Sequence, residues 1–199
     1  YLITLSIARY VEVKDSAKVQ DGVSVREVPM TNWVLPGREE DAKRTFAKTP
    51  AMVSYFSDLL DSPYPWDKYD QVLVYQFFGG MENTSATNII DRALMDKRAA
   101  LDNDFDGLIS HELAHQWFGD LITCKDWSHL WLNEGITSYF QAVWKAKDLG
   151  ADEFSYDLYQ KAQAVFSEEG SYKRAIVTDR YESPDDMFDR HTYEKGAWV

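Results

Sequence analysis

The sequence predicts one α+β domain, residues 1–199, in which strands come first and helices follow. Residues 2–13 and 23–28 show the partial alternation of apolar and polar side chains that is typical of strands. Helical patterns dominate from about residue 104 onward. With 199 residues, 45% of them hydrophobic and 15% aromatic, the chain is long enough to bury a substantial core.

The first half of the chain alternates between these patterns and segments that break them. The polar stretch 14–22 separates the two strand patterns, and Pro36-Gly37 interrupts the chain after the second. A long helical pattern at 39–60, interrupted or bent near Pro50, is followed by a proline-containing loop at 61–66. A strand is expected at 71–78, and it runs directly into the glycine-containing segment 79–83.

The second half is predicted to be helical. Three helices are expected over 104–117, 129–149 and 152–167. The polar segment 170–189, which contains Pro184, is predicted to be a loop.

The charge balance argues against two classes of partner. The chain has 21 basic and 33 acidic residues, a formal net charge of −12, and such a chain repels nucleic acid and anionic membrane surfaces. No apolar run approaches the roughly 18–20 residues that span a bilayer. The opening residues resemble a strand and not a targeting peptide. Since the chain starts without Met and stops in mid-pattern, we expect a piece of a longer protein.

The centre of the site prediction is His111-Glu-Leu-Ala-His115. On a helix, positions i and i+4 lie about 40° apart around the axis and one turn apart along it, so both imidazoles project from one face. Neutral imidazole binds Zn²⁺ with bonds of roughly 2.0–2.1 Å. Glu112, turned by about 100°, can act on a water beside the metal without ligating it. The alternative interpretation is an amphipathic helix with two surface histidines.

A catalytic zinc site uses three protein ligands and a water, so a third ligand is needed. Glu134 is the candidate, because it stands in the otherwise apolar run Trp131–Gly135, where a carboxylate is costly to bury without a compensating cation. Eighteen residues separate it from His115, enough for a turn and the start of an antiparallel helix. A solvated glutamate on a helix face is the alternative.

Together these residues resemble the zinc signature of the aminopeptidase N family of zinc metallopeptidases, the gluzincins, which also includes leukotriene epoxide hydrolase. Gly79-Gly-Met-Glu-Asn83 resembles the exopeptidase motif of that family, and Tyr193-Glu-Lys-Gly-Ala197 resembles its catalytic tyrosine segment. The resemblance implies a thermolysin-like catalytic domain, with an N-terminal mixed β-sheet lobe, a helical lobe and a truncated C-terminus. It also implies one Zn²⁺ per chain.

The resemblance assigns the substrate contacts to the glycine-containing segment. Glu82 would bind the α-amino group of the substrate, as a carboxylate attracts an ammonium group. The backbone of Gly79, Gly80 and Met81 would line the cleft beside the peptide, because glycine permits close approach.

The resemblance also assigns the remaining catalytic roles. Glu112 would accept the proton of the attacking water and pass it to the leaving amine. Tyr193 would donate a hydrogen bond to the tetrahedral oxyanion. The alternatives are an ordinary core or surface tyrosine at 193, and the nearby Tyr181 as a less favoured candidate for the role.

The chain departs from the family pattern in several places. Gln141 stands seven residues after Glu134, where many relatives carry a supporting glutamate. The N-terminal β domain and the C-terminal helical region of the family are expected to be missing from this chain. His129 and His191 are interpreted as ordinary polar residues, and Cys124, the single cysteine, as small and buried or half-buried.

The sequence therefore predicts a zinc-dependent aminopeptidase that hydrolyses the N-terminal residue from peptides by metal-activated water. One alternative is an epoxide hydrolase on the same scaffold. The other is a fragment or scaffold that binds zinc but is inactive. The expected partners are peptides with a free N-terminus and the missing domains of the same polypeptide.

Overall fold

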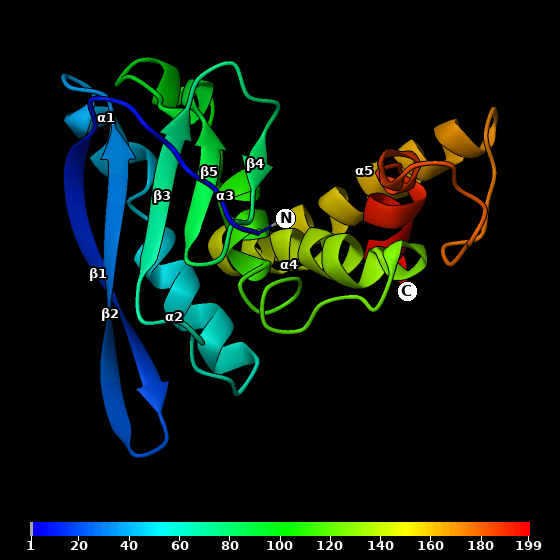
Figure 1. Cartoon of the computed structure of the whole chain (residues 1–199), viewed down its shortest axis with the longest axis horizontal. Helices are drawn as coiled ribbons and strands as arrows, with labels where there is room; N and C mark the ends of the chain where they lie inside the picture. Colours follow the sequence, from blue (N-terminus) through cyan, green and yellow to red (C-terminus); the bar gives the residue numbers. More distant parts are fainter. Residues whose placement is uncertain (1) are drawn as a thin grey trace. The chain divides into compact units, whose positions relative to one another are not determined.

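The computed structural model describes residues 2–199, which form two compact units. Unit 1 is Tyr1–Gln116 and unit 2 is Trp117–Val199. Unit 1 contains the β-sheet and three helices, whereas unit 2 is built mainly from two long helices (Figure 1). The order of strands first and long helices later agrees with the α+β prediction.

The elements of each unit have the following bounds. The strands are β1 (Val11–Asp21), β2 (Ser24–Val34), β3 (Tyr69–Val74), β4 (Gly80–Met81) and β5 (Ala86–Ile90). The helices are α1 (Glu39–Thr45), α2 (Thr49–Leu59) and α3 (Asp106–Ala114) in unit 1, and α4 (Trp131–Leu149) and α5 (Ala151–Glu169) in unit 2. Short 3₁₀ or π turns lie at Asp91–Ala93, Ala99–Leu101, Trp127–His129, Pro184–Met187, His191–Lys195 and Gly196–Trp198.

The five strands of unit 1 form one mixed sheet in the order β1-β2-β3-β5-β4. β1 and β2 are an antiparallel hairpin, whereas β2–β3 and β3–β5 are parallel pairs. The short β4 runs antiparallel to β5 at the edge, with Gly80 opposite Ile89 and Met81 opposite Asn88. The predicted glycine-containing segment therefore begins on the edge strand of the sheet.

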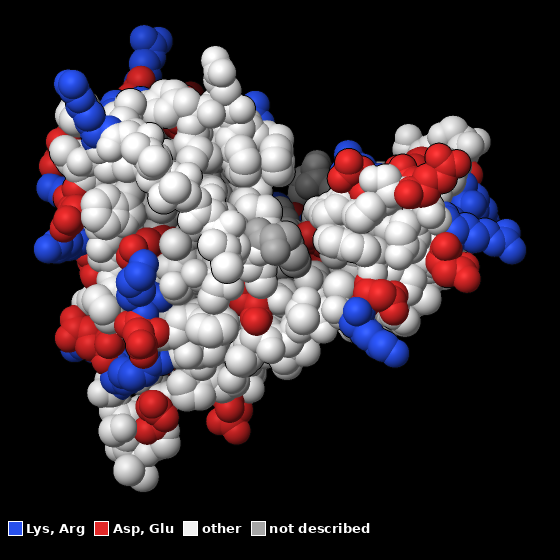
Figure 2. All heavy atoms as spheres, viewed as in Figure 1, with Lys and Arg blue, Asp and Glu red and all other residues white. Residues whose placement is uncertain are grey.

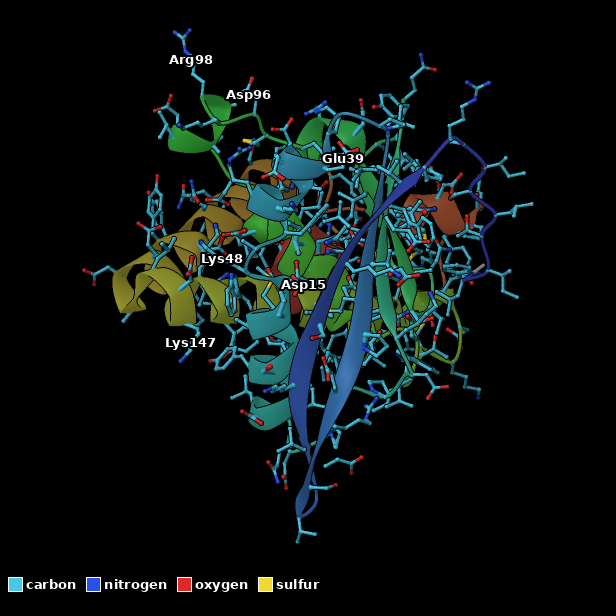
Figure 3. All side chains as sticks on the ribbon, turned by 90° about the vertical axis from the view of Figure 1, so that its left-hand side faces the viewer. Asp15, Glu39, Lys48, Asp96, Arg98 and Lys147 are labelled. Atoms are coloured by element: carbon cyan, nitrogen blue, oxygen red, sulfur yellow. The ribbon has the colours of Figure 1, made fainter. Side chains whose placement is uncertain are left out.

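Helices α1–α3 cover one face of this sheet, as the view along the sheet in Figure 3 shows. Their contact with the strands buries a continuous apolar core, which includes Ala17, Val28, Met30, Phe46, Met52, Val53, Phe56, Leu73, Ile89, Ile109 and Leu113. Lys48, labelled in Figure 3 at the start of α2, pairs with Asp106 at the start of α3 (Nζ to Oδ2, 2.6 Å). The first turn of α3 is thereby fixed to the neighbouring helix.

The predicted strand at 2–13 is wrong over most of its length. Ile3, Leu5 and Ile7 alternate in the sequence but are 83–97% exposed, and residues 2–10 form no strand. The segment instead crosses the other face of the sheet, where Ser6 donates a hydrogen bond to Asn88 (Oγ to Oδ1, 3.3 Å). Its apolar side chains face outward, so alternation alone gave a false strand signal.

Conversely, the polar stretch 14–22 is mostly part of β1 and not a separator. Val13, Ala17 and Val19 face the core, while polar side chains between them face solvent. Asp15, labelled in Figure 3, has the same phase as Val13 and Ala17 but is exposed. In a strand with one buried face, every second residue is expected to be apolar. Asp15 is charged and Ala17 is small, so the sequence of β1 does not show this alternation clearly.

The helical pattern expected over 39–60 is interrupted near Pro50, as the sequence allowed. α1 ends at Thr45 and α2 begins afresh at Thr49, with Pro50 in its first turn, where the missing N–H costs no helical hydrogen bond. The expected strand 71–78 ends as β3 at Val74, because Gln76 adopts a left-handed φ of 54° that cannot continue a ladder.

Unit 2 is an antiparallel pair of 19-residue helices, α4 and α5, joined at Gly150. Gly150 has a φ of 103°, which glycine adopts without strain. Between the two helices, Asp157 of α5 forms ion pairs with Lys145 of α4 and Lys161 of α5. The predicted bounds of these helices agree with the structure to within about two residues at each end.

None of the helices in residues 2–199 combines the length and the apolar character needed to cross a membrane. On the face of unit 1 shown in Figure 2, acidic and basic side chains are interspersed over the β1–β2 hairpin. The net negative charge is therefore not gathered into one acidic patch on that face.

Candidate active site

Helix α3 presents the two predicted histidine ligands on one face. The ring nitrogens Nε2 of His111 and His115 lie 3.2 Å apart, and His115 is only 1% exposed. Two ligands of one tetrahedral zinc, each with a bond of roughly 2.0–2.1 Å, are separated by about 3.3–3.4 Å. The imidazole pair therefore fits a shared divalent ion. α3 ends at Ala114, and His115 is its C-cap residue with helical backbone angles.

Glu112 lies between these histidines in sequence and is 5% exposed. Its carboxylate packs against the α-carbon of Gly80 on the edge strand β4. Only a residue without a side chain leaves room for this contact. The glycine-containing segment and α3 are thus in direct contact inside unit 1.

Glu82 follows β4 and is also 5% exposed. One ligating atom each from Glu82, Glu112 and His115 lies within 4.8 Å of the others. Two buried carboxylates beside an imidazole concentrate negative charge, which a metal ion or an ammonium group would compensate. Unit 1 therefore brings together the predicted residues Gly80, Glu82, Glu112 and His115 with His111.

In unit 2, Glu134 lies in the first turn of α4 and is 4% exposed. An anionic side chain is favoured there by the amide groups at the start of the helix. The turn is held in place by Asn133, whose Oδ1 accepts a hydrogen bond from the Cys124 amide (3.0 Å). Cys124 is half-buried, as expected, and burial raises the pKa of its thiol.

Tyr193 also lies in unit 2, within the π-helical turn His191–Lys195. π turns occur frequently at functional sites. The chain after Tyr193 packs directly on the first turn of α4, because a β-carbon added at Gly135 would lie 2.7 Å from the Gly196 backbone. Unit 2 therefore places the segments that carry Glu134 and Tyr193 side by side.

The segment before Tyr193 is irregular, as predicted, but is firmly anchored. Arg174 donates hydrogen bonds to both carboxylate oxygens of Asp189 (2.7 and 2.6 Å) and to Oγ1 of Thr192 (2.8 Å). His191 is fully buried, with Nδ1 3.1 Å from Oε2 of Glu168. No sequence pattern indicates the role of Arg174, since it stands in a polar segment, and the interpretation of His191 as an ordinary polar residue does not predict its burial.

The other residues considered from the sequence lie outside these clusters. Tyr181 lies in the irregular segment before the turn Pro184–Met187, and His129 lies in the turn before α4. Gln141 lies half-buried on α4, two turns after Glu134. The prediction from the sequence also overlooked Gln116, which follows His115 directly and is completely buried.

Comparison with known proteins agrees with this geometry. Residues 44–199 match the model of the peptidase family M1 domain. Aminopeptidase N of Streptomyces lividans is 33% identical over 211 residues, which cover 100% of this chain and 24% of that protein. Endoplasmic reticulum aminopeptidase 1 of Rattus norvegicus is 29% identical over 207 residues, covering 100% of the chain and 22% of that protein.

Among solved structures, a two-domain M1 zinc metallopeptidase bound to L-tryptophan is similar, with a TM-score of 0.67 and 25% identity. The match covers 92% of this chain and 38% of that one. The match to the family model confirms the predicted family resemblance. The structural match confirms the predicted α+β fold, a mixed β-sheet lobe followed by helices. The predicted zinc cofactor agrees with the name of this neighbour, a zinc metallopeptidase. The chain spans about a quarter or less of the length of these curated relatives.

Proposed function

Because the chain belongs to the M1 peptidase family, a family of peptide hydrolases, we propose that it is the catalytic part of a zinc-dependent aminopeptidase that removes N-terminal residues from peptides. The main support is the pair of ring nitrogens on α3, 3.2 Å apart, with Glu112 and Glu82 buried beside His115. The curated relatives named above are themselves called aminopeptidases, which favours cleavage at the N-terminus.

In this proposal His111, His115 and Glu134 hold one Zn²⁺. The nitrogen–nitrogen distance supports the first two ligands, and burial in the first turn of α4 supports the third. A bound zinc ion would polarise the scissile carbonyl and activate the attacking water.

The remaining roles belong to residues of the chain. Glu112 takes the proton of the attacking water and delivers it to the leaving amine, as a general base and then a general acid. Tyr193 donates a hydrogen bond to the oxyanion that develops on the scissile carbonyl. These two steps are supported by the buried position of Glu112 and by the π-helical turn that holds Tyr193.

Substrate orientation falls to the segment around β4. Glu82 binds the α-ammonium group of the peptide through a charge-assisted hydrogen bond. The backbone of Gly79, Gly80 and Met81 lies beside the peptide. Since β4 is the edge strand of the sheet, its outer side is available to an extended chain.

The test uses the natural polypeptide that contains this chain, with Glu112→Gln as the diagnostic variant. We expect wild-type protein to cleave aminoacyl-arylamides, and the variant to lose turnover by at least about 100-fold while it retains one zinc per chain. Full activity of the variant, or absence of bound zinc in the wild type, would overturn the proposal. Turnover of a lipid epoxide without cleavage of arylamides would indicate the epoxide hydrolase instead.

Glu82→Ala tests the anchoring of the amino group. We expect it to raise KM for peptides with a free amino terminus by about tenfold or more, because a charge-assisted hydrogen bond is lost. An unchanged KM would remove Glu82 from the substrate site.

A further inference from the structure

The side chain of Gln116 connects α3 to the loop between β4 and β5. Its Nε2 donates a hydrogen bond to the carbonyl oxygen of Glu82 (3.3 Å). Its Oε1 accepts one from the amide of Ser85 (2.8 Å). One amide group thus binds both ends of the loop Glu82–Ser85, donating at one end and accepting at the other.

Gln116 is itself held rigidly. It is 0% exposed, and its backbone oxygen accepts a hydrogen bond from Nε1 of Trp66 (3.2 Å). The hydroxyl of Tyr64, also 0% exposed, lies 3.3 Å from Oε1 of Gln116. A side chain fixed at both its backbone and its tip loses little further entropy when it binds the loop.

The loop that Gln116 holds has an unfavourable backbone conformation. Ser85 has a φ of 59°, a left-handed value that costs free energy for a residue other than glycine. Its carbonyl oxygen accepts a hydrogen bond from the Asp70 amide (2.9 Å), which ties the loop to β3. The hydrogen bond from the Ser85 amide to Gln116 ties it to α3. These bonds from two sides maintain the strained turn.

We propose that Gln116 is a positioning residue that sets the location of the Glu82 carboxylate relative to Glu112 and His115. The inference rests on the proposed function insofar as Glu82 binds the amino group of the substrate. Gln116 follows His115 directly, so the backbone that carries the imidazole also determines where the loop lies. The separation of Glu82, Glu112 and His115, all within 4.8 Å, depends on this connection.

The chemistry of the amide distinguishes positioning from simple filling of the core. Gln116→Met keeps a similar volume but removes both hydrogen bonds to the loop, together with the one from the Tyr64 hydroxyl. Gln116→Glu keeps an acceptor for Ser85 but places a second oxygen against the carbonyl of Glu82. Gln163→Met, at an exposed position of α5, is the matched control.

The first measurement is inhibitor binding to the zinc-loaded natural polypeptide. The probes are an α-amino acid hydroxamate and the same hydroxamate without its amino group. We expect Gln116→Met to weaken binding of the amino-bearing hydroxamate about tenfold. Binding of the hydroxamate without the amino group should weaken less than twofold. In a Glu82→Ala background the same substitution should have no further effect on either probe, since interacting residues are not additive. Equal weakening of both probes, or an additive effect, would show a general structural role and overturn the inference.

The second measurement does not depend on the function of Glu82. Hydrogen exchange of the Ser85 amide should accelerate at least tenfold in Gln116→Met and Gln116→Glu, and remain unchanged in Gln163→Met. If wild-type protein does not prefer the amino-bearing hydroxamate, the role of Glu82 in the proposed function fails, and exchange at Ser85 alone decides the inference. A Ser85 amide that stays protected in both Gln116 variants overturns it.

Discussion

The α-carbon of Gly80 faces the carboxylate of Glu112 so closely that an added β-carbon would lie 2.1 Å from Oε1. Since this glycine is on the edge strand and the glutamate is on α3, the contact fixes the distance between the proposed peptide-binding backbone and the proposed base. Glycine at this position is therefore required by the packing and not by a turn.

Gly80→Ala should displace Glu112 and lower kcat by about 100-fold, because a misplacement of roughly 1 Å at a reacting group has effects of that size. Zinc content should stay at the wild-type level. Gly170→Ala, in unit 2 and outside the proposed substrate segment, is the control. Similar kcat values for the two variants would show that the Glu112 contact does not position the base.

The ion pairs of Asp157 predict a dependence of stability on acid pH. Burial opposes ionisation of Asp157, but hydrogen bonds and charges from Lys145 and Lys161 outweigh it, so the pKa of this carboxyl is lowered. A lowered pKa in the folded state stabilises the fold above the unfolded value of about 3.9. This contribution is lost as the pH falls through the folded pKa.

Asp157→Asn should therefore lower the free energy of unfolding by roughly 3 kcal/mol at pH 7, because two lysines lose their counter-charge in a partly buried setting. The difference from wild type should shrink below about pH 4. Urea unfolding at several pH values measures both effects, with Asp179→Asn at an exposed position as the control. A constant difference across this pH range would contradict the assignment.

The close packing of Gly135 on Gly196 predicts a second intolerant glycine. A β-carbon at Gly135 would lie 2.7 Å from the Gly196 backbone, which is too close for the segments to remain in place. Gly135→Ala should lower the free energy of unfolding by about 1–3 kcal/mol despite the better helix propensity of alanine. Gly79→Ala is the control, because a β-carbon there meets no atom within 4 Å, and it should leave the free energy of unfolding nearly unchanged.

Arg174 should organise the segment that precedes Tyr193. Besides Asp189 and Thr192, its guanidinium donates hydrogen bonds to the carbonyl oxygens of Ala175 and Ile176 (2.8 and 2.9 Å). Arg174→Lys keeps the charge but cannot reproduce this planar fork. Limited proteolysis should then cut residues 172–190 several-fold faster than in wild type, whereas the exposed Arg180→Lys should have no such effect. An unchanged cleavage rate would exclude this role.

The sequence predicted best those features that depend on neighbours along the chain. Helix α4 and the imidazole pair follow from apolar periodicity and from the i, i+4 spacing of His111 and His115. The resemblance of three short motifs to one family was also sufficient to predict the fold, because those motifs occur together in the right order.

The features that the sequence did not predict depend on contacts between segments that are separated in the chain. No local pattern shows that Gln116 reaches Ser85, or that Gly135 meets Gly196. β5 was overlooked because it is only five residues long and is buried on both faces from Thr87 to Ile90, so it shows no alternation of apolar and polar side chains. Ile3 and Leu5 misled the prediction because alternation does not reveal which face will be covered.

The mixed topology of the sheet also determines the sequence of events by which unit 1 can assemble. β1 and β2 meet through a short turn, whereas Met30 of β2 reaches Tyr69 of β3 only after the chain between them has closed a long loop. Local pairs of this kind form in microseconds, and non-local ones are slower. β4 and β5 also lie close in the chain, with Gly80 opposite Ile89, so this edge can pair as early as the β1–β2 hairpin, and the parallel pairs of β3 with β2 and β5 come later.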